Sequence, residues 1–161
     1  MRALLALMLV VAVAAASAPT AAATPLWSWP LAAPHPVVRP FIAPETPFSS
    51  GHRGIDIGGV DGGAVMAPAD GVVHFAGWVV DRPVVSIRHV GGLVSSFEPV
   101  TASVYQGEPV ERGQVIGVLE AGHCAMPCLH FGVRLYGEYV SPMLLLEGIP
   151  RSVLLPTREL G

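Results

Sequence analysis

The chain carries a histidine and an aspartate at a spacing that suits metal binding. His52 and Asp56 lie in the segment Gly-His-Arg-Gly-Ile-Asp-Ile, and imidazole and carboxylate groups are both ligands of zinc. Around Asp56, glycines alternate with Ile55 and Ile57, which predicts a short strand with the carboxylate on one face and the isoleucines on the other. Taken alone, this pair also fits a surface turn.

A second candidate ligand lies far downstream, in the segment Cys-Leu-His-Phe-Gly-Val-Arg-Leu. In a strand, His130 and Cys128 share one face, whereas Leu129, Phe131 and Val133 point to the other. His130 is therefore predicted to point away from the apolar core. Taken alone, it also fits a hydrogen-bonded structural histidine.

The elements that must position these residues are predicted to be strands. Short runs rich in valine and isoleucine are separated by glycine, proline or aspartate, and none of them has helical periodicity. The expected strands are 64–66, 71–80, 84–89, 93–97, 115–120 and 129–135, and one turn of helix is expected at 143–146. The pattern predicts an all-β domain.

Two segments, 67–73 and 110–117, each place a polar turn with glycine before a Val/Ile strand. Such turns occur in barrel-like β-sandwiches, including biotinyl and lipoyl carrier domains. Those domains attach their cofactor to a lysine, and this chain has nine arginines and no lysine. A cofactor carrier is therefore excluded.

In their order and in the strands between them, the two ligand segments resemble the LytM/lysostaphin family of peptidoglycan-cleaving zinc endopeptidases, over about residues 51–146. The family's H-x-x-x-D motif and the second histidine of its H-x-H motif match His52, Asp56 and His130. The resemblance implies a Zn²⁺ site, peptidoglycan peptides as substrate, and an antiparallel barrel-like β-sandwich of the duplicated hybrid motif type. Three protein ligands leave a fourth zinc position open, as catalytic zinc sites require.

The chain departs from the family where two further histidines assist the reaction. Cys128 replaces the first histidine of H-x-H, and Pro99 replaces the histidine that ends an aromatic-x-His strand. Loss of such groups typically costs about 10²–10⁴-fold each in rate. His123 and Glu98 are the candidate catalytic substitutes. Strand alternation turns Glu98 away from the face of Pro99 unless the proline introduces a bulge. The alternative function is a degenerate member that binds the cell wall or regulates a separate wall hydrolase.

The two cysteines, Cys124 and Cys128, are predicted to form a disulfide if the chain is exported. Alternatively, a reduced Cys128 is a fourth zinc ligand, which would close the site and make it structural. His35, His74 and His89 are interpreted as structural or surface residues.

The domain organisation follows from composition. Residues 1–23 resemble a signal peptide, with Arg2 before an uncharged apolar run and small residues at two cleavage positions, after Ala18 or Ala23; an uncleaved anchor is the alternative. Residues 24–50 contain seven prolines and are predicted to be an extended strap whose aromatics pack on the domain, rather than a free linker. Residues 51–147 form the predicted domain, and 148–161 are a tail.

Charge and export determine the expected partners. The net charge is −3 with no basic run, which argues against nucleic-acid binding. The expected location is secreted or cell-wall associated, with membrane contact only through the export signal. The sequence does not indicate an oligomeric state.

Overall fold

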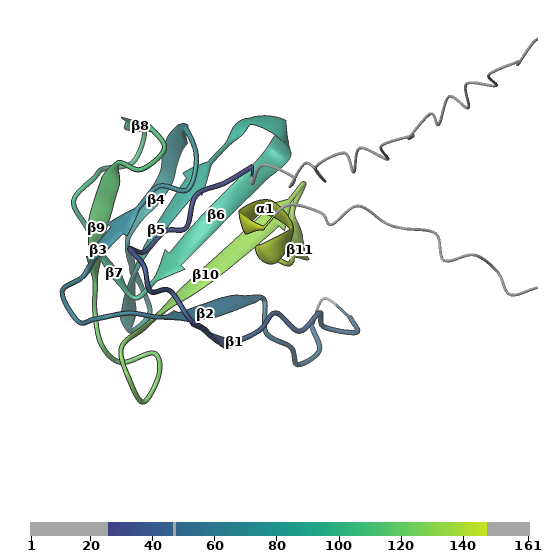
Figure 1. Cartoon of the computed structure of the whole chain (residues 1–161). Helices are drawn as coiled ribbons and strands as arrows, with labels where there is room; N and C mark the ends of the chain where they lie inside the picture. Colours follow the sequence, from purple (N-terminus) through teal and green to yellow (C-terminus); the bar gives the residue numbers. More distant parts are fainter. Residues whose placement is uncertain (1–25, 47, 148–161) are drawn as a thin grey trace, which may run out of the picture.

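The computed structural model describes residues 26–46 and 48–147, and it is built almost entirely of strands (Figure 1). The predicted signal peptide, residues 1–23, and the tail, 148–161, lie outside the described residues. The strands are β1 (Val37–Arg39), β2 (Gly54–Gly58), β3 (Ala64–Met66), β4 (Gly71–Val79), β5 (Arg82–Arg88), β6 (Leu93–Glu98), β7 (Val100–Ala102), β8 (Pro109–Val110), β9 (Val115–Leu119), β10 (Cys128–Leu135) and β11 (Glu138–Val140). A 3-10 turn, η1 (Val90–Gly92), precedes β6, and the helix α1 (Met143–Leu146) follows β11.

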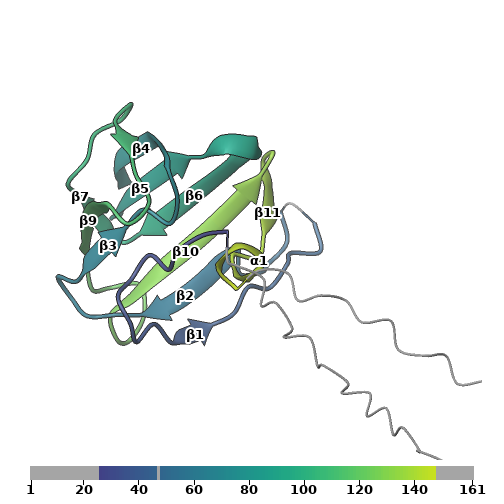
Figure 2. The ribbon, with the colours of Figure 1, turned by 45° about the horizontal axis from the view of Figure 1, so that its top comes forward.

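The strands form two antiparallel sheets. The larger sheet has the order β1-β2-β10-β6-β5-β4-β8, with β11 paired to β10, and the smaller one has the order β3-β9-β7. Figure 2 shows the long strands β10 and β6 side by side in the middle of the larger sheet, with the smaller sheet at one end. This arrangement confirms the predicted all-β antiparallel fold.

One face of β10 supplies much of the core. Leu129, Phe131 and Val133 are fully buried, as the period-two alternation predicts. The ring of Phe131 stacks on that of Phe97 in β6 at 5.2 Å between centroids. Complete burial of such a side chain contributes about 1.5–3 kcal/mol, so the core anchors the strand whose other face carries His130.

The Pro-rich strap is part of the domain. Trp27 is buried, and Trp29 and Phe41 pack against the core cluster, which confirms the predicted packing for these three aromatics. Phe48 is 98% exposed, so the same prediction is wrong there. The strap also contributes strand β1, which pairs with β2.

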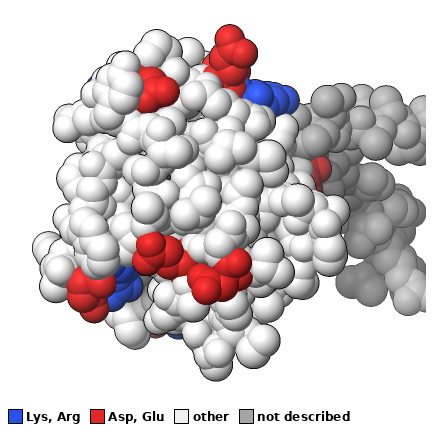
Figure 3. Space-filling model, turned by 90° about the vertical axis from the view of Figure 1, so that its left-hand side faces the viewer, with Lys and Arg blue, Asp and Glu red and all other residues white. Residues whose placement is uncertain are grey.

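The side of the molecule that carries β3, β7 and β9 is mostly uncharged, with acidic groups near both its lower and its upper edges in Figure 3. No helix among the described residues is long and apolar enough to span a membrane.

His89 is a buried structural histidine, as predicted. Its ring lies 4.6 Å from that of Trp27. Its Nδ1 contacts the Asp70 carbonyl and its Nε2 contacts the Ser95 hydroxyl, both at 2.8 Å. Burial lowers the pKa of His89, although the contact with the Asp70 carbonyl acts in the opposite direction. The neutral imidazole is therefore the form that the fold accommodates.

This burial predicts a loss of stability in mild acid. Below about pH 6.5, the ordinary pKa of histidine, the unfolded chain binds a proton at His89 more readily than the folded protein does. The free energy of unfolding should therefore fall as the pH drops from 6.5 towards the lowered pKa. Urea unfolding with a chelator present, at pH values from 7.5 to 5, should show a shallower decline for His89→Gln. Parallel curves for the two proteins would contradict the prediction.

Candidate metal centre

Asp56 lies in the middle of β2, between two isoleucines that are fully buried in the core. Alternation turns its carboxylate to the other face of the sheet. The register pairs Asp56 with His130 of β10. In an antiparallel pair, directly opposite residues share a face, so the fold brings together two side chains that are 74 residues apart.

The imidazole of His130 lies over glycines. A Cβ atom added at Gly54 would come within 2.8 Å of the His130 ring and 2.5 Å of the Phe131 carbonyl oxygen. Because Gly54 has no side chain, the ring can lie flat against β2 and direct its Nδ1 at Asp56, 2.8 Å from Oδ1. Gly54, which lies between His52 and Asp56 in the sequence motif, thus makes room for His130.

His52 is oriented by the strap. It forms a β-bridge with Ile42, and its Nδ1 lies 2.7 Å from the carbonyl oxygen of Pro40. A carbonyl only accepts, so Nδ1 carries the proton and Nε2 presents its lone pair. That Nε2 is 3.0 Å from Asp56 Oδ1 and 3.1 Å from His130 Nδ1. An outer hydrogen bond of this kind is what orients histidine ligands in metal sites.

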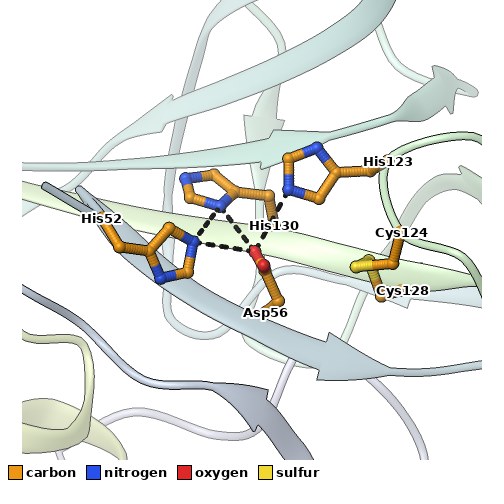
Figure 4. The surroundings of a disulfide bond; sticks show 6 residues. All are labelled: His52, Asp56, His123, Cys124, Cys128 and His130. Atoms are coloured by element: carbon orange, nitrogen blue, oxygen red, sulfur yellow. Dashed lines mark hydrogen bonds and ion pairs between the residues drawn. A yellow bond between two sulfur atoms is a disulfide. The ribbon is translucent and has the colours of Figure 1, made fainter. Parts of the chain in front are cut away.

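His123 also reaches the cluster. Its Nε2 lies 3.2 Å from Asp56 Oδ1, and Figure 4 shows its ring pointing toward the same carboxylate as the two other histidines. The next residue, Cys124, forms a disulfide with Cys128 at the start of β10. The predicted disulfide is therefore present, and it ties the loop that carries His123 to a strand of the site. With both sulfurs in this bond, Cys128 is not a metal ligand in this state.

The donor set fits a zinc ion. One ligand atom from each of His52, Asp56, His123 and His130 lies within 4.8 Å of all the others. Tetrahedral zinc with bonds of about 2.0–2.1 Å holds its ligand atoms about 3.3 Å apart, close to the separations of 2.8–3.1 Å among His52, Asp56 and His130. Imidazole nitrogens with a carboxylate oxygen are also the chemistry that zinc takes.

The protonation states favour metal binding. Burial acts to raise the pKa of Asp56, but the hydrogen bond with His130 and the nearby charges of the histidines outweigh it and leave the pKa below its ordinary value. Burial lowers the pKa of His130, against the opposing effect of Asp56. An ionised carboxylate and a neutral imidazole are the forms that bind metals.

Glu98 lies on the same face as His130, since the register places the two residues directly opposite each other. If one strand continued through Pro99, the alternation of its side chains would turn Glu98 away from the face that Pro99 occupies. Instead, β6 ends at Glu98 and β7 of the second sheet begins at Val100. The chain changes sheets at Pro99, so alternation does not continue through it. The Glu98 carboxylate lies 3.6 Å from the guanidinium of Arg82 and is not one of the four clustered ligand groups.

Sequence reasoning missed two contributors to the site. One is the Pro40 carbonyl, which orients His52. Sequence patterns describe side chains, so they do not indicate which backbone carbonyl of the strap accepts a hydrogen bond. Arg82 reaches Glu98 from β5, a pairing that depends on strand register. A cavity of about 350 Å³ opens beside His123 and includes Arg82 and Pro99 in its lining.

Known proteins share this sequence pattern. A sequence model of Peptidase family M23 matches residues 50–142. An uncharacterised protein of Mycobacterium tuberculosis is 46% identical over 130 residues, covering 76% of this chain and 52% of that protein. The murein hydrolase activator NlpD of Salmonella typhimurium is 32% identical over 135 residues, covering 82% of this chain and 34% of NlpD. The chain thus spans about half the length of the mycobacterial relative.

Solved structures share the fold. The structure of Helicobacter pylori Csd3 superposes with a TM-score of 0.66 and 25% sequence identity, covering 81% of this chain and 37% of Csd3. The similarity therefore extends over most of the chain rather than over the ligand motifs alone.

Proposed function

Because this chain belongs to peptidase family M23, we propose that it is a zinc-dependent hydrolase of peptide bonds in peptidoglycan, with His52, Asp56 and His130 as the metal ligands. The observation that carries the proposal is that these three side chains meet at one point, with distances that suit zinc. They come from separate parts of the chain: His52 directly after the strap, Asp56 in β2 and His130 in β10. Similarity to a murein hydrolase activator supports the cell wall as the place of action.

When bound, zinc supplies Lewis-acid chemistry, polarising a peptide carbonyl and making a water molecule more acidic. The chain's own residues hold and orient the reacting groups around it. The Pro40 carbonyl fixes the tautomer of His52, and Asp56 provides the negative charge that balances the cation.

His123 is the proposed proton carrier. It comes from a loop rather than from a strand, and its Nε2 points at the ligand cluster. An imidazole there takes a proton from the attacking water and returns it to the departing amide nitrogen. Glu98 is the second residue proposed to take part in catalysis. It faces His130 across the strands, and its charge acts to raise the pKa of that imidazole.

The proposal includes export. The signal-like residues 1–23 direct the chain out of the cytoplasm, so that it is secreted or associated with the cell wall. A disulfide between Cys124 and Cys128 is consistent with such a compartment.

The direct test combines metal analysis with product analysis. Purified protein should contain one zinc per chain, and mass spectrometry should detect new peptide fragments after incubation with peptidoglycan. Chelation should stop their formation, and added zinc should restore it. Intact wall peptides after prolonged incubation with fully zinc-loaded protein would contradict the proposal.

Replacement of His123 should separate catalysis from metal binding. His123→Gln is expected to lower kcat by about a hundredfold, at the lower end of the effect of losing a general acid/base, with zinc content unchanged. His74→Gln is the matched control, because His74 is exposed and its Nδ1 contacts the guanidinium of Arg88 at 2.9 Å. If His123→Gln instead loses zinc, His123 is a ligand and not the proton carrier.

A regulator without catalysis is the second candidate function. The observation that favours it is the replacement of two family histidines by Pro99 and Cys128, together with the similarity to a murein hydrolase activator. Such a protein would bind zinc and peptidoglycan, release no fragments alone, and increase fragment release when a separate wall hydrolase is added.

A further inference from the structure

The cavity beside His123 has a position that suits a substrate side chain. It lies between the β4–β5 hairpin and the segment that follows β9, and it has a volume of about 350 Å³. His123 lines this cavity while its Nε2 contacts Asp56. A peptide whose scissile bond lies at the ligand cluster would therefore place a neighbouring side chain in the cavity.

The charges around the cavity are mostly negative. Asp81 and Glu120 line it. Glu98, which is not part of the lining, lies 3.6 Å from Arg82, the one arginine among the described lining residues. Arg82 also contacts Asp81 at 3.0 Å, and their hydrogen bond lowers the pKa of Asp81. Three carboxylates against one guanidinium leave two negative charges in excess.

Glu120 is the carboxylate of this set that does not share Arg82. It accepts a hydrogen bond from the Thr101 hydroxyl, which fixes its position at the end of β9. The chain has no lysine, so no side-chain ammonium of its own competes for this carboxylate. The excess negative charge is thus available to a cation from outside.

Trp78 provides an independent feature of the same cavity. It lies near the end of β4, lines the cavity and is 68% exposed, although tryptophan is usually largely buried. The face of an indole ring attracts ammonium groups more strongly than any other side-chain ring does. An exposed indole and carboxylates that line the same cavity are a combination that suits an alkylammonium group, because the ring can contact both its methylene chain and its charge.

We infer that this cavity binds the side-chain ammonium group of a diamino acid that neighbours the scissile bond of the substrate peptide. The inference rests on the proposed peptidase function, because that function places a peptide at the cluster. Trp78 and Glu120 are then the residues that determine specificity, while Arg82 holds Asp81 at the cavity wall and pairs with Glu98 behind it. An acidic or acetylated side chain at the same position is disfavoured.

The test uses two synthetic peptides that are identical except that the side-chain amine of one lysine is free or acetylated. Calorimetry on the zinc-loaded protein should show the free amine binding about five- to tenfold more tightly at low salt. Glu120→Gln and Trp78→Ala should each reduce this ratio to about twofold or less. Glu111→Gln is the matched control, since Glu111 is an exposed carboxylate in the turn before β9, and it should leave the ratio unchanged.

The outcomes for the cavity and for the peptidase are separable. Equal binding of the two peptides, or a ratio that survives both Glu120→Gln and Trp78→Ala in folded protein, overturns the inference even if both peptides are cleaved. A retained preference for the free amine without any cleavage supports the cavity and contradicts the peptidase proposal. Circular dichroism checks that each variant is folded. If one of the two variants does not fold, the other still tests the inference.

Discussion

Asp56→Asn is expected to lose zinc binding and, with it, all measurable hydrolysis of peptidoglycan. The carboxylate contacts three imidazoles, with His52, His123 and His130 at 2.8–3.2 Å from Oδ1. An amide of the same size has no charge to balance the metal, and even loss of an outer hydrogen bond in a metal site costs about 10–100-fold in affinity. The loss for this ligand should therefore exceed about a hundredfold.

Thermal unfolding offers a readout that does not depend on activity. A metal that binds only the folded protein at a hundred times its Kd adds about 2.7 kcal/mol of stability, so zinc should raise the Tm of the wild type and leave that of Asp56→Asn unchanged. Asp81→Asn is a useful comparison because this carboxylate is exposed and pairs with Arg82. Equal zinc-dependent shifts in all three proteins would show that the metal binds elsewhere.

Gly54→Ala is expected to cause the second large effect, on both folding and metal binding. The added methyl group would come within 2.5 Å of a backbone oxygen and 2.8 Å of the His130 ring. Backbone in the middle of a sheet cannot move aside without breaking its pairing, so the cost should reach or exceed the upper part of the range of about 1–3 kcal/mol for overpacking. For a domain of this size, a Tm lower by about 10 °C is expected.

Gly132→Ala is the matched control for this prediction. A methyl group there would first meet the hydroxyl of Ser96 at 2.8 Å, and a serine side chain can rotate away. Its loss of stability should be clearly smaller, and its zinc affinity should remain close to that of the wild type. If the two variants unfold at the same temperature, the close approach of His130 to Gly54 does not limit stability.

The long strands and the three-residue strand β3, predicted at 64–66, could be predicted from the sequence, and four other short strands could not. β4, β5, β6, β9 and β10 begin and end within two residues of the predicted ranges, because each has β-branched or aromatic residues between clear turn signals. Strands β1, β7, β8 and β11 have only two or three residues. Their pairing depends on the neighbouring strands rather than on a pattern of their own.

The candidate site was predictable where it lies on strands. Alternation alone turns Asp56 and His130 away from the core, and the register then joins them. His123 lies in a loop, where no periodicity indicates direction, so its approach to Asp56 depends on how the chain folds around the Cys124–Cys128 bond. The orientation of Glu98 could not be predicted either, since it depends on the transfer of the chain between sheets at Pro99.

The strap has a practical consequence for any shortened form of this protein. The family match begins at residue 50, which makes that position a natural place to trim a gene for expression. A fragment that starts there lacks Pro40 and Ile42, which hold His52, and Trp27, whose amide pairs with Leu145 near the other end of the domain. The same cut made by a protease among the strap's exposed residues would separate His52 from the backbone that orients it while leaving every proposed metal ligand in the chain.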